Sequence, residues 1–313
     1  MAQTGQPHMV MNNSKFLVTG ATGQLAPSIV RELARSHTVH AIARFGAAGS
    51  REKLEALGAR CIAFDYTRDD LDQLDRDYDY VLHFATYQVQ GSEDFDEAIR
   101  VNALGTGRLM YHFRNVKAFF FSSTASVYQP RGTTPHKETA PLGDSMRGFT
   151  PTYAMSKVAA EAVVKFVSQQ FGIPTVIARM NVSYGPNGGL PVIHLDALRK
   201  GEPIHLHSNK PSLYNPIHET DYHEKMVALL AHASSPALTV NWCGSQSVGA
   251  EQWCGYLGEL LGVTPRFVYS DSMIPGTPCD PALMHKLVGE TRIDWRDGMR
   301  ELVECGAMDP RTH

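Results

Sequence analysis

Apolar positions in the first half of the chain alternate between two patterns. Short apolar runs of strand length are separated by segments whose apolar residues recur at helical spacing. The runs expected to form strands are Phe16–Thr19, Thr38–Ala43, Arg60–Phe64, Tyr80–Phe84 and Ala118–Ser122. The segments expected to form helices are Gln24–Ala34, Arg51–Leu57, Phe95–Phe113 and Tyr153–Phe166. Strands and helices in this alternation predict crossover units and therefore a parallel sheet.

The rhythm changes after Gly185, where prolines and glycines predict a loop followed by shorter elements rich in His and Pro. We therefore expect an α/β fold, a Rossmann-type doubly wound parallel sheet with a smaller C-terminal α/β substrate lobe. The dinucleotide-binding domain is expected over residues 15–180, with a segment near 212–242 that returns to it. The substrate lobe is expected over 181–211 and 243–313, and residues 1–14 are expected to form a flexible tail.

Composition narrows the class of protein. The chain has 313 residues, a formal net charge of −3, 43% hydrophobic and 19% charged residues, which excludes a disordered chain. The sequence pI near 6.5 argues against nucleic acid or a membrane surface as partner. The 5 cysteines form no C-x-x-C pair, and the histidines form no recognised ligand pattern. We expect reduced thiols, no metal and a cytoplasmic location.

A glycine turn follows the first predicted strand. Gly20, Gly23 and Ala26 form G-x-x-G-x-x-A at the junction of a strand and a helix. Glycine permits the tight turn and the approach of a pyrophosphate, and the helix N-terminus offers free N–H groups. We expect the cofactor phosphates to contact this turn, which contains Gly20, Thr22, Gly23, Gln24 and Leu25.

The residue at the end of the second predicted strand differs from the one that NAD enzymes usually carry there. NAD enzymes usually place Asp or Glu there for the ribose hydroxyls, and here the residue is Arg44. A guanidinium suits the 2′-phosphate of NADP, which favours NADP, with NAD as an alternative and a solvated surface arginine as the simplest interpretation. Other residues after strands are expected to line the cofactor: Asp65, Tyr66, Phe84, Ala85 and Thr86.

Two segments indicate acid–base chemistry. Tyr153 and Lys157 are spaced i, i+4, so they lie on one face of a predicted helix. A phenol that works as a base near neutrality needs its pKa lowered by about 3 units, and a nearby ammonium and a positive nicotinamide ring supply such charges. Thr124 lies at the end of the fifth predicted strand, where a hydroxyl can hydrogen-bond a reacting oxygen, with Ser123 as its rival.

With these motifs, the chain resembles the extended branch of the short-chain dehydrogenase/reductase superfamily, the epimerases and dehydratases that act on nucleotide sugars. The resemblance runs from Phe16 to about Leu302. It rests on the glycine turn and on these further segments: His83–Ala85, Val101–Thr106, Ser122–Tyr128, Tyr153–Lys157 and Arg179–Pro186.

The resemblance implies a role for several residues. Tyr153 is the acid/base, Lys157 lowers its pKa and holds the nicotinamide ribose, and Thr124 contacts the substrate oxygen. Asn102 supports the cofactor site, and Ser122 is expected to line it. Family members often dimerise through the helices that carry Asn102 and Tyr153, so the resemblance also implies a homodimer.

The two residues after Thr124 narrow the reaction. Family dehydratases typically carry Asp-Glu there, and this chain has Ala125 and Ser126. The segment is similar to that of the 4-epimerases, which remove a hydride and return it to the other face of a keto sugar. The resemblance therefore favours an NAD(P)-dependent sugar epimerase-like oxidoreductase. The alternative is an NADPH-dependent ketone reductase or alcohol dehydrogenase that acts on a small molecule without a nucleotide, and a dinucleotide-sensing regulator is a third hypothesis.

The expected substrate contacts depart from the family pattern. Family members carry an Asn at the position of Val182 and an Arg at the position of Tyr214, both of which contact a diphosphate; Asn181 lies one residue early. Either Lys210 compensates, or the substrate has no nucleotide. The substrate, a sugar, a sugar nucleotide or another alcohol or ketone, is expected to contact Thr86, Ser123, Thr124, Asn181, Val182 and Tyr214.

Overall fold

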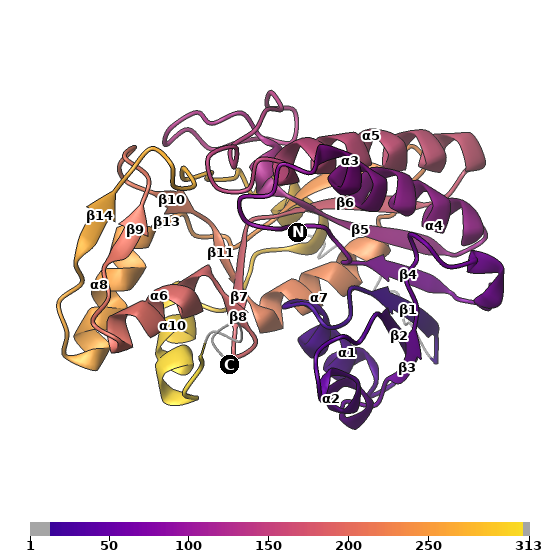
Figure 1. Cartoon of the computed structure of the whole chain (residues 1–313), viewed down its shortest axis with the longest axis horizontal. Coiled ribbons are helices and arrows are strands. Elements are labelled where there is room, and N and C mark those ends of the chain that lie inside the picture. Colours follow the sequence, from indigo (N-terminus) through magenta and orange to yellow (C-terminus); the bar gives the residue numbers. More distant parts are fainter. Residues whose placement is uncertain (1–12, 309–313) are drawn as a thin grey trace, which may run out of the picture.

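The computed structural model describes residues 13–308 and is built on a seven-stranded sheet (Figure 1). The strand order is β12-β6-β5-β4-β1-β2-β3, and every neighbouring pair is parallel. The strands are β1 Lys15–Thr19, β2 Thr38–Ala43, β3 Arg60–Ala63, β4 Tyr80–His83, β5 Ala118–Thr124, β6 Thr175–Met180 and β12 Leu238–Trp242. The chain leaves β1 in one direction and returns at β4 in the other, so the strand order reverses between them.

Helices cover both faces of the sheet. Figure 1 shows α3, α4 and α5 above the sheet, and α1, α2 and α7 below it. The helices are α1 Ala26–Leu33, α2 Ser50–Ala56, α3 Phe95–Ile99, α4 Thr106–His112, α5 Tyr153–Phe171, α7 Glu219–Leu230 and α9 Ala282–Val288. Three short helical turns are η1 Leu71–Gln73, η2 Arg100–Gly105 and η3 Ala125–Val127. Each face has its own apolar core, which confirms the predicted doubly wound Rossmann-type fold.

The predicted strands and helices of the first half form, with most bounds shifted by no more than two residues, while α5 continues beyond the predicted Phe166 to Phe171. The exception is the long segment Phe95–Phe113, which is interrupted by a π-helical turn, η2. Such turns often occur at functional sites. Gly105 closes this turn against Tyr66, because a Cβ at Gly105 would lie 2.9 Å from the Tyr66 ring.

The second half adds a smaller lobe, at the left of Figure 1. Its helices are α6 Leu190–Arg199, α8 Ala250–Leu261 and α10 Trp295–Glu304. Its strands are β7 Val182–Gly185, β8 Gly188–Gly189, β9 Ile204–Leu206, β10 Leu213–Tyr214, β11 Pro216–His218, β13 Val248–Gly249 and β14 Phe267–Tyr269. A third apolar core, centred on Trp253, Leu257 and Met299, holds this lobe together.

The chain crosses between the two halves more than once. Strand β12 pairs with β6, so the chain returns to the sheet within the segment near 212–242 that was expected to do so. Helix α9 falls within the predicted substrate-lobe range 243–313, yet Met284 and Val288 belong to the core beneath the sheet. That range therefore needs correction, because α9 buries its apolar face against α7 and β12. Residues 1–12 of the predicted tail lie outside the described residues.

Two absences apply to residues 13–308. No helix there has both the length and the apolar character needed to cross a bilayer. Within the same residues, no group of three or more His, Cys, Asp or Glu side chains is arranged to hold a metal ion.

Candidate active site

The glycine turn lies where the strand order reverses. Gly20 has φ +64°, and a Cβ there would lie 2.5 Å from the backbone nitrogen of Ala85, which follows β4. Only glycine allows this approach of the two strand ends. Gly23 donates its N–H to the Gly20 carbonyl at 2.9 Å. No side chain of the described residues caps the N-terminus of α1, so its N–H groups can donate to an anion.

Gln24 joins the glycine turn to the smaller lobe. Its side-chain nitrogen lies 3.1 Å from both the carbonyl and the hydroxyl oxygen of Ser183 on β7. Thr22 and Gly23 are exposed, and Leu25 packs partly buried against the core beneath the sheet. Thr22 and Gly23 are therefore open to solvent at the start of α1, while Gln24 is bonded to β7.

Arg44 and Asp65 come together at the end of β2 and β3. Desolvation acts to raise the pKa of the Asp65 carboxyl, but hydrogen bonds from Thr67 and, to a smaller extent, the charge of the exposed Arg44 lower it overall. Asp65 Oδ1 accepts from the Thr67 hydroxyl at 2.6 Å. The Tyr66 side chain requires correction as a cofactor contact, because it is buried in the core and its hydroxyl donates to the Val101 carbonyl at 3.2 Å.

Asn102 organises the loop after β4. Its Oδ1 accepts from the Tyr87 backbone N–H at 2.7 Å and from the Thr86 hydroxyl at 3.2 Å. Its Nδ2 donates to Ser156 Oγ on α5 at 2.8 Å. This buried amide therefore ties the loop that follows Phe84 and the catalytic helix to one point on η2. The arrangement agrees with a supporting role for Asn102.

Thr124 and Tyr153 form the centre of the site. The Thr124 hydroxyl shares a hydrogen bond with the Tyr153 phenol, and both side chains are less than one-tenth exposed. The Ser126 hydroxyl lies 3.2 Å from Thr124 Oγ1, and the Ser126 N–H donates to the same oxygen at 3.1 Å. The end of β5 thus presents a hydroxyl to the first residue of α5.

Lys157 lies one helical turn beyond Tyr153 and is 2% exposed. Its ammonium donates to the Ser122 carbonyl at 2.7 Å and lies 4.1 Å from the centre of the Phe121 ring. The structure therefore brings Thr124, Tyr153 and Lys157 together, and places Ser122 beside them through its carbonyl.

Burial sets the pKa values of these groups. Burial raises the pKa of Tyr153 to about 12, against the opposing hydrogen bond from Thr124. Burial lowers the pKa of Lys157 to about 7, against the opposing charge of Glu161. The expected fall of the Tyr153 pKa is therefore not produced by the chain's own groups, because desolvation of the phenolate exceeds the favourable interactions. Two positive charges were expected to lower this pKa, the Lys157 ammonium and a nicotinamide ring, and the ring is the one that the chain itself does not supply.

Ser123 is not part of this group, which corrects its place as a substrate contact. Its side chain is 3% exposed and donates to Glu161 on α5 at 2.6 Å. The adjacent Thr124 contacts Tyr153 instead, so Thr124 and not Ser123 is directed at the acid–base residue.

The expected substrate residues of the smaller lobe are bonded to the fold. The Tyr214 ring packs against Trp253 and its hydroxyl donates to the Ile274 carbonyl at 3.2 Å. Asn181 donates to the Thr277 carbonyl at 2.8 Å, and its Oδ1 accepts backbone N–H groups. Tyr214 as a substrate contact is therefore corrected to a core residue. Val182 is partly buried and packs beside the same core.

The sequence motifs did not single out two residues of the site. Ser156 accepts from Asn102, and Glu161 pairs with Arg179 while both are almost completely buried. The available signal was helical spacing: Glu161 lies four residues after Lys157, and is a lone acid on the buried face of α5.

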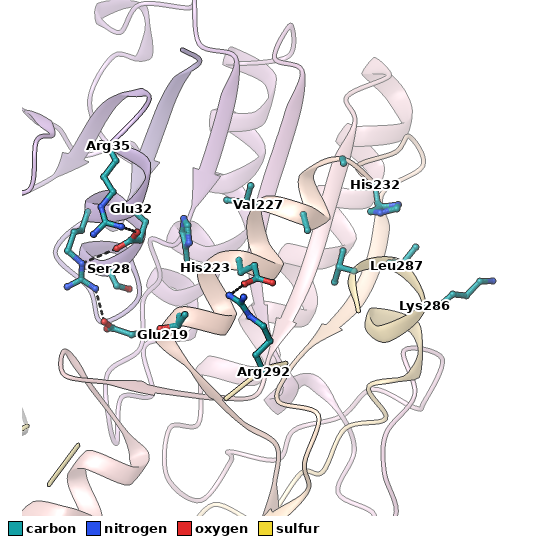
Figure 2. Close-up of a pocket in the computed structure, with 16 residues that line it drawn as sticks. Ser28, Glu32, Arg35, Glu219, His223, Val227, His232, Lys286, Leu287 and Arg292 are labelled. Carbon is teal, nitrogen blue, oxygen red and sulfur yellow. Dashed lines mark hydrogen bonds and ion pairs between the residues drawn. The ribbon is translucent and has the colours of Figure 1, made fainter. Parts of the chain in front are cut away.

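One groove of the described residues lies away from this chemistry. The groove has a volume of about 1010 Å³ and lies between α1, α7 and α9. Figure 2 shows residues that line it, among them Glu32, His223 and Leu287. Its arginines are paired with glutamates; Arg31 contacts Glu219 at 2.7 Å. None of the acid–base residues lines this groove, so we place the chemistry at the carboxyl ends of the strands.

Comparison with known proteins now identifies the family. The model of the NAD dependent epimerase/dehydratase family matches residues 16–241. The chain belongs to this family. Its members include the extended short-chain dehydrogenase/reductase enzymes, as the motifs predicted.

Similar proteins agree with this assignment. The chain is 28% identical over 223 residues to dTDP-glucose 4,6-dehydratase of Neisseria meningitidis, covering 62% of this chain and 61% of that protein. It is 23% identical to a trifunctional UDP-glucose 4,6-dehydratase of Arabidopsis thaliana, covering 94% of this chain. The chain spans 47% of the length of the Arabidopsis protein.

Solved structures share the fold. UDP-glucuronic acid 4-epimerase of Bacillus cereus, in complex with UDP-glucuronic acid and NAD, matches with TM-score 0.79 and 20% identity over 92% of this chain and 97% of that one. UDP-N-acetylglucosamine 4-epimerase of Methanobrevibacter ruminantium matches with TM-score 0.80 and 20% identity over 94% and 98%.

The site fits a dinucleotide of the kind used by this family. The uncapped N-terminus of α1 offers N–H donors, and Gly20 and Gly23 keep the turn free of side chains. Lys157, one helical turn after Tyr153, provides a buried ammonium held at the Ser122 carbonyl. Thr86 and Ala85 follow β4 on the other side of the reversal point.

Proposed function

We propose that this family member is a nicotinamide-dependent sugar epimerase of the 4-epimerase type, which acts at a secondary alcohol or ketone. The observation that carries the proposal is the hydrogen-bonded pair of Thr124 and Tyr153 beside the ammonium of Lys157. This group supplies acid–base chemistry and nothing more. A bound nicotinamide dinucleotide would supply the hydride acceptor and donor.

Each side chain has a defined task. The Tyr153 phenolate accepts the proton of the substrate hydroxyl and later returns it to the carbonyl oxygen. Thr124 Oγ1 donates to the same oxygen and holds it beside the phenol. Together with the positive ring of a bound nicotinamide, the charge of Lys157 would offset the desolvation that raises the pKa of Tyr153. The Ser122 carbonyl fixes the ammonium in place, since the two atoms lie 2.7 Å apart.

The two residues after Thr124 support epimerisation over dehydration. Ala125 is 3% exposed, and Ser126 lies in hydrogen-bond contact with Thr124. Neither carries a carboxylate that could assist loss of water. The curated relatives include 4,6-dehydratases, so the proposed reaction departs from the activity that these proteins are named for.

Epimerisation is tested on the purified protein with UDP-glucuronic acid, UDP-glucose and their dTDP counterparts. Proton NMR should show the 4-epimer without any added cofactor and without net oxidation. A 4-keto-6-deoxy product would contradict the proposal and identify a dehydratase. Stoichiometric consumption of added NADPH would contradict it and identify a reductase.

The second candidate is an NADPH-dependent reductase or alcohol dehydrogenase for a ketone or alcohol without a nucleotide. The bonded state of Tyr214 and Asn181 favours it, because neither presents a cation or a free amide to a diphosphate. Calorimetry with UDP and dTDP separates the candidates. Micromolar binding of either nucleotide supports the epimerase, and absence of binding together with NADPH turnover supports the reductase.

We also propose a preference for NADP. Arg44 is exposed at the end of β2, where NAD enzymes place an acid. The family name and the solved neighbours refer to NAD, and the Asp65 carboxylate beside Arg44 opposes a phosphate. Arg44→Asp should lower the preference for NADP over NAD, measured as the ratio of the two affinities, by about tenfold or more. Arg60→Asp is the control, because Arg60 is the first residue of β3 and lies at the opposite end of the strand from Asp65. An equal ratio of NADP and NAD affinities in wild type and Arg44→Asp contradicts the role of Arg44.

A homodimer and a cytoplasmic location complete the proposal. Four large side chains are exposed on η2, α4 and α5: Leu104, Tyr111, Phe166 and Phe171. Phe166 is 64% exposed, and the Tyr111 and Phe171 rings pack 5.0 Å apart. This apolar face supports self-association through these helices. Phe166→Glu should yield a monomer in light scattering; a wild-type monomer contradicts the dimer. The five free cysteines support a reducing compartment.

A further inference from the structure

A buried ion pair lies one helical turn beyond Lys157. Glu161 on α5 and Arg179 on β6 are each 1% exposed. Arg179 Nε donates to Glu161 Oε1 at 2.9 Å, and Nη2 donates to Oε2 at 2.7 Å. The pair is therefore bidentate and fully removed from solvent, a geometry with strict directional demands.

The same carboxylate also reaches β5. Ser123 Oγ donates to Glu161 Oε1 at 2.6 Å. Ser123 lies between Ser122, whose carbonyl accepts from Lys157, and Thr124, which is bonded to Tyr153. One carboxylate thus joins α5, β5 and β6 beside the acid–base group.

The arginine is held from its other side. Arg179 Nη1 donates to the Glu138 carbonyl at 2.9 Å, and its guanidinium lies 4.8 Å from the centre of the Tyr128 ring. Two well-packed apolar residues would stabilise a core as well as a buried ion pair does. The charge and the direction of these bonds therefore need an explanation other than stability.

The surroundings of Lys157 supply an explanation for the buried ion pair. The groups around its ammonium are the Ser122 carbonyl and Phe121 ring from β5, the buried His83 from β4, and Glu161 from its own helix. Burial lowers the pKa of His83 to about 3, so His83 is neutral. Glu161 is the one negative charge acting on Lys157 among the described residues.

The groups that face Glu161 are Arg179 from β6, Ser123 from β5 and Lys165 from its own helix. We propose that Glu161 is a positioning residue for the acid–base group: its carboxylate fixes β5 against α5 and keeps the Lys157 ammonium charged. The inference rests on the proposed function only for its effect on turnover, since the effect on Lys157 itself requires no substrate.

The direct test is the titration of Lys157 in the full chain, followed by NMR of lysine labelled with ¹³C at Cε. The signal is assigned by its loss in Lys157→Arg. Glu161→Gln should lower the Lys157 midpoint by about one pH unit, because a buried negative charge one turn away is removed. An unchanged midpoint overturns the charge role, whether or not any substrate is turned over.

A matched control uses the same carboxylate. Lys165 contacts Glu161 Oε2 at 3.7 Å but is exposed. Lys165→Gln should leave both the Lys157 midpoint and kcat unchanged. An equal shift in this variant overturns the specific role of Glu161, because any change of charge near α5 would then suffice.

A second pair of variants tests position and folding. Ser123→Ala removes the bond between Glu161 and β5 without changing charge, so it should lower kcat about tenfold with an unchanged Lys157 midpoint. A wild-type kcat in this variant overturns the role of Glu161 in fixing β5 against α5.

Glu161→Gln leaves Arg179 buried without its partner, so the double variant Glu161→Gln/Arg179→Met restores a neutral pair. The double variant should keep the lowered Lys157 midpoint, and recovery of the wild-type midpoint overturns the proposal.

Discussion

The acid–base group and the smaller lobe differ in how far apart in sequence their bonded residues lie. In the acid–base group, Lys157 bonds to a residue 35 positions away and Ser123 to one 38 positions away. In the smaller lobe, Tyr214 bonds to a residue 60 positions away and Asn181 to one 96 positions away. Two short motifs, the end of β5 and the start of α5, therefore carry the chemistry, while the substrate surface depends on segments that lie further apart in the chain. Such a surface can change its ligand without disturbing the reaction.

The largest effect is expected at the phenol. Tyr153→Phe should lower kcat by about 10³-fold, because the proton acceptor is lost, and should leave dinucleotide affinity nearly unchanged. Steady-state kinetics and fluorescence titration with the cofactor measure the two quantities. Wild-type turnover in this variant would show that Tyr153 is not the base. The matched control is the same substitution at Tyr214 in the smaller lobe.

The glycine turn should be next in sensitivity. Gly20→Ala places a Cβ 2.5 Å from the Ala85 nitrogen at φ +64°, so it should lower the free energy of unfolding by about 3 kcal/mol and weaken dinucleotide binding. Gly49→Ala is the control, because Gly49 has φ +73° with no atom within 4 Å. Equal losses from both variants in urea unfolding would mean that backbone strain, not the approach to Ala85, requires the glycine.

Burial of Lys157 should reduce stability in a pH-dependent way. The pKa of Lys157 is lowered to about 7 in the folded chain from 10.5 in the unfolded one. Between these values the unfolded state binds more protons, so this residue's contribution to stability rises with pH from about 7 to 10.5. Below the folded pKa the full cost of burying the charge remains.

Lys157→Met should therefore stabilise the chain at pH 7 by about 2 kcal/mol, since removal of the buried charge outweighs the lost bond to Ser122. The gain should shrink toward pH 10, and turnover should be lost. Denaturant unfolding across this pH range checks it, with the exposed Lys165→Met as control. Destabilisation at pH 7 would show that the ammonium is well solvated by its partners.

The smallest effect is expected in the smaller lobe. Tyr214→Phe removes the donor to the Ile274 carbonyl and should lower the free energy of unfolding by about 1 kcal/mol. The substrate KM should stay unchanged, because the hydroxyl is engaged by the fold. A large rise in KM without loss of stability would return Tyr214 to the substrate site.

The first half of the fold follows from its sequence pattern. Strand-length apolar runs and helical segments predicted the parallel sheet, because each element's periodicity states which face is buried. Apolar periodicity did not predict the interruption at η2, because a π-helical turn leaves most of the helical spacing of the segment unchanged. The partners of Asn102 lie on the loop after β4 and on α5, so they meet it only in the packed structure.

The choice between Ser123 and Thr124 shows the same limit. Two hydroxyls at a strand end are equivalent in sequence, and both contact residues of α5 in the structure. The packing of α5 decides their roles, since Glu161 accepts from Ser123 while Tyr153 contacts Thr124. The loss of an expected Arg at Tyr214 was visible in sequence, whereas its burial against Trp253 was not.

By itself, the sequence determined the family, the dinucleotide turn and the acid–base group, because these depend on spacing within one turn or one strand end. Tertiary structure decided the direction of each pKa shift, the exclusion of Ser123, Tyr66 and Tyr214 from the ligand surface, and the pairing of Glu161 with Arg179. These properties depend on desolvation and on contacts between distant segments, and neither is encoded in local periodicity.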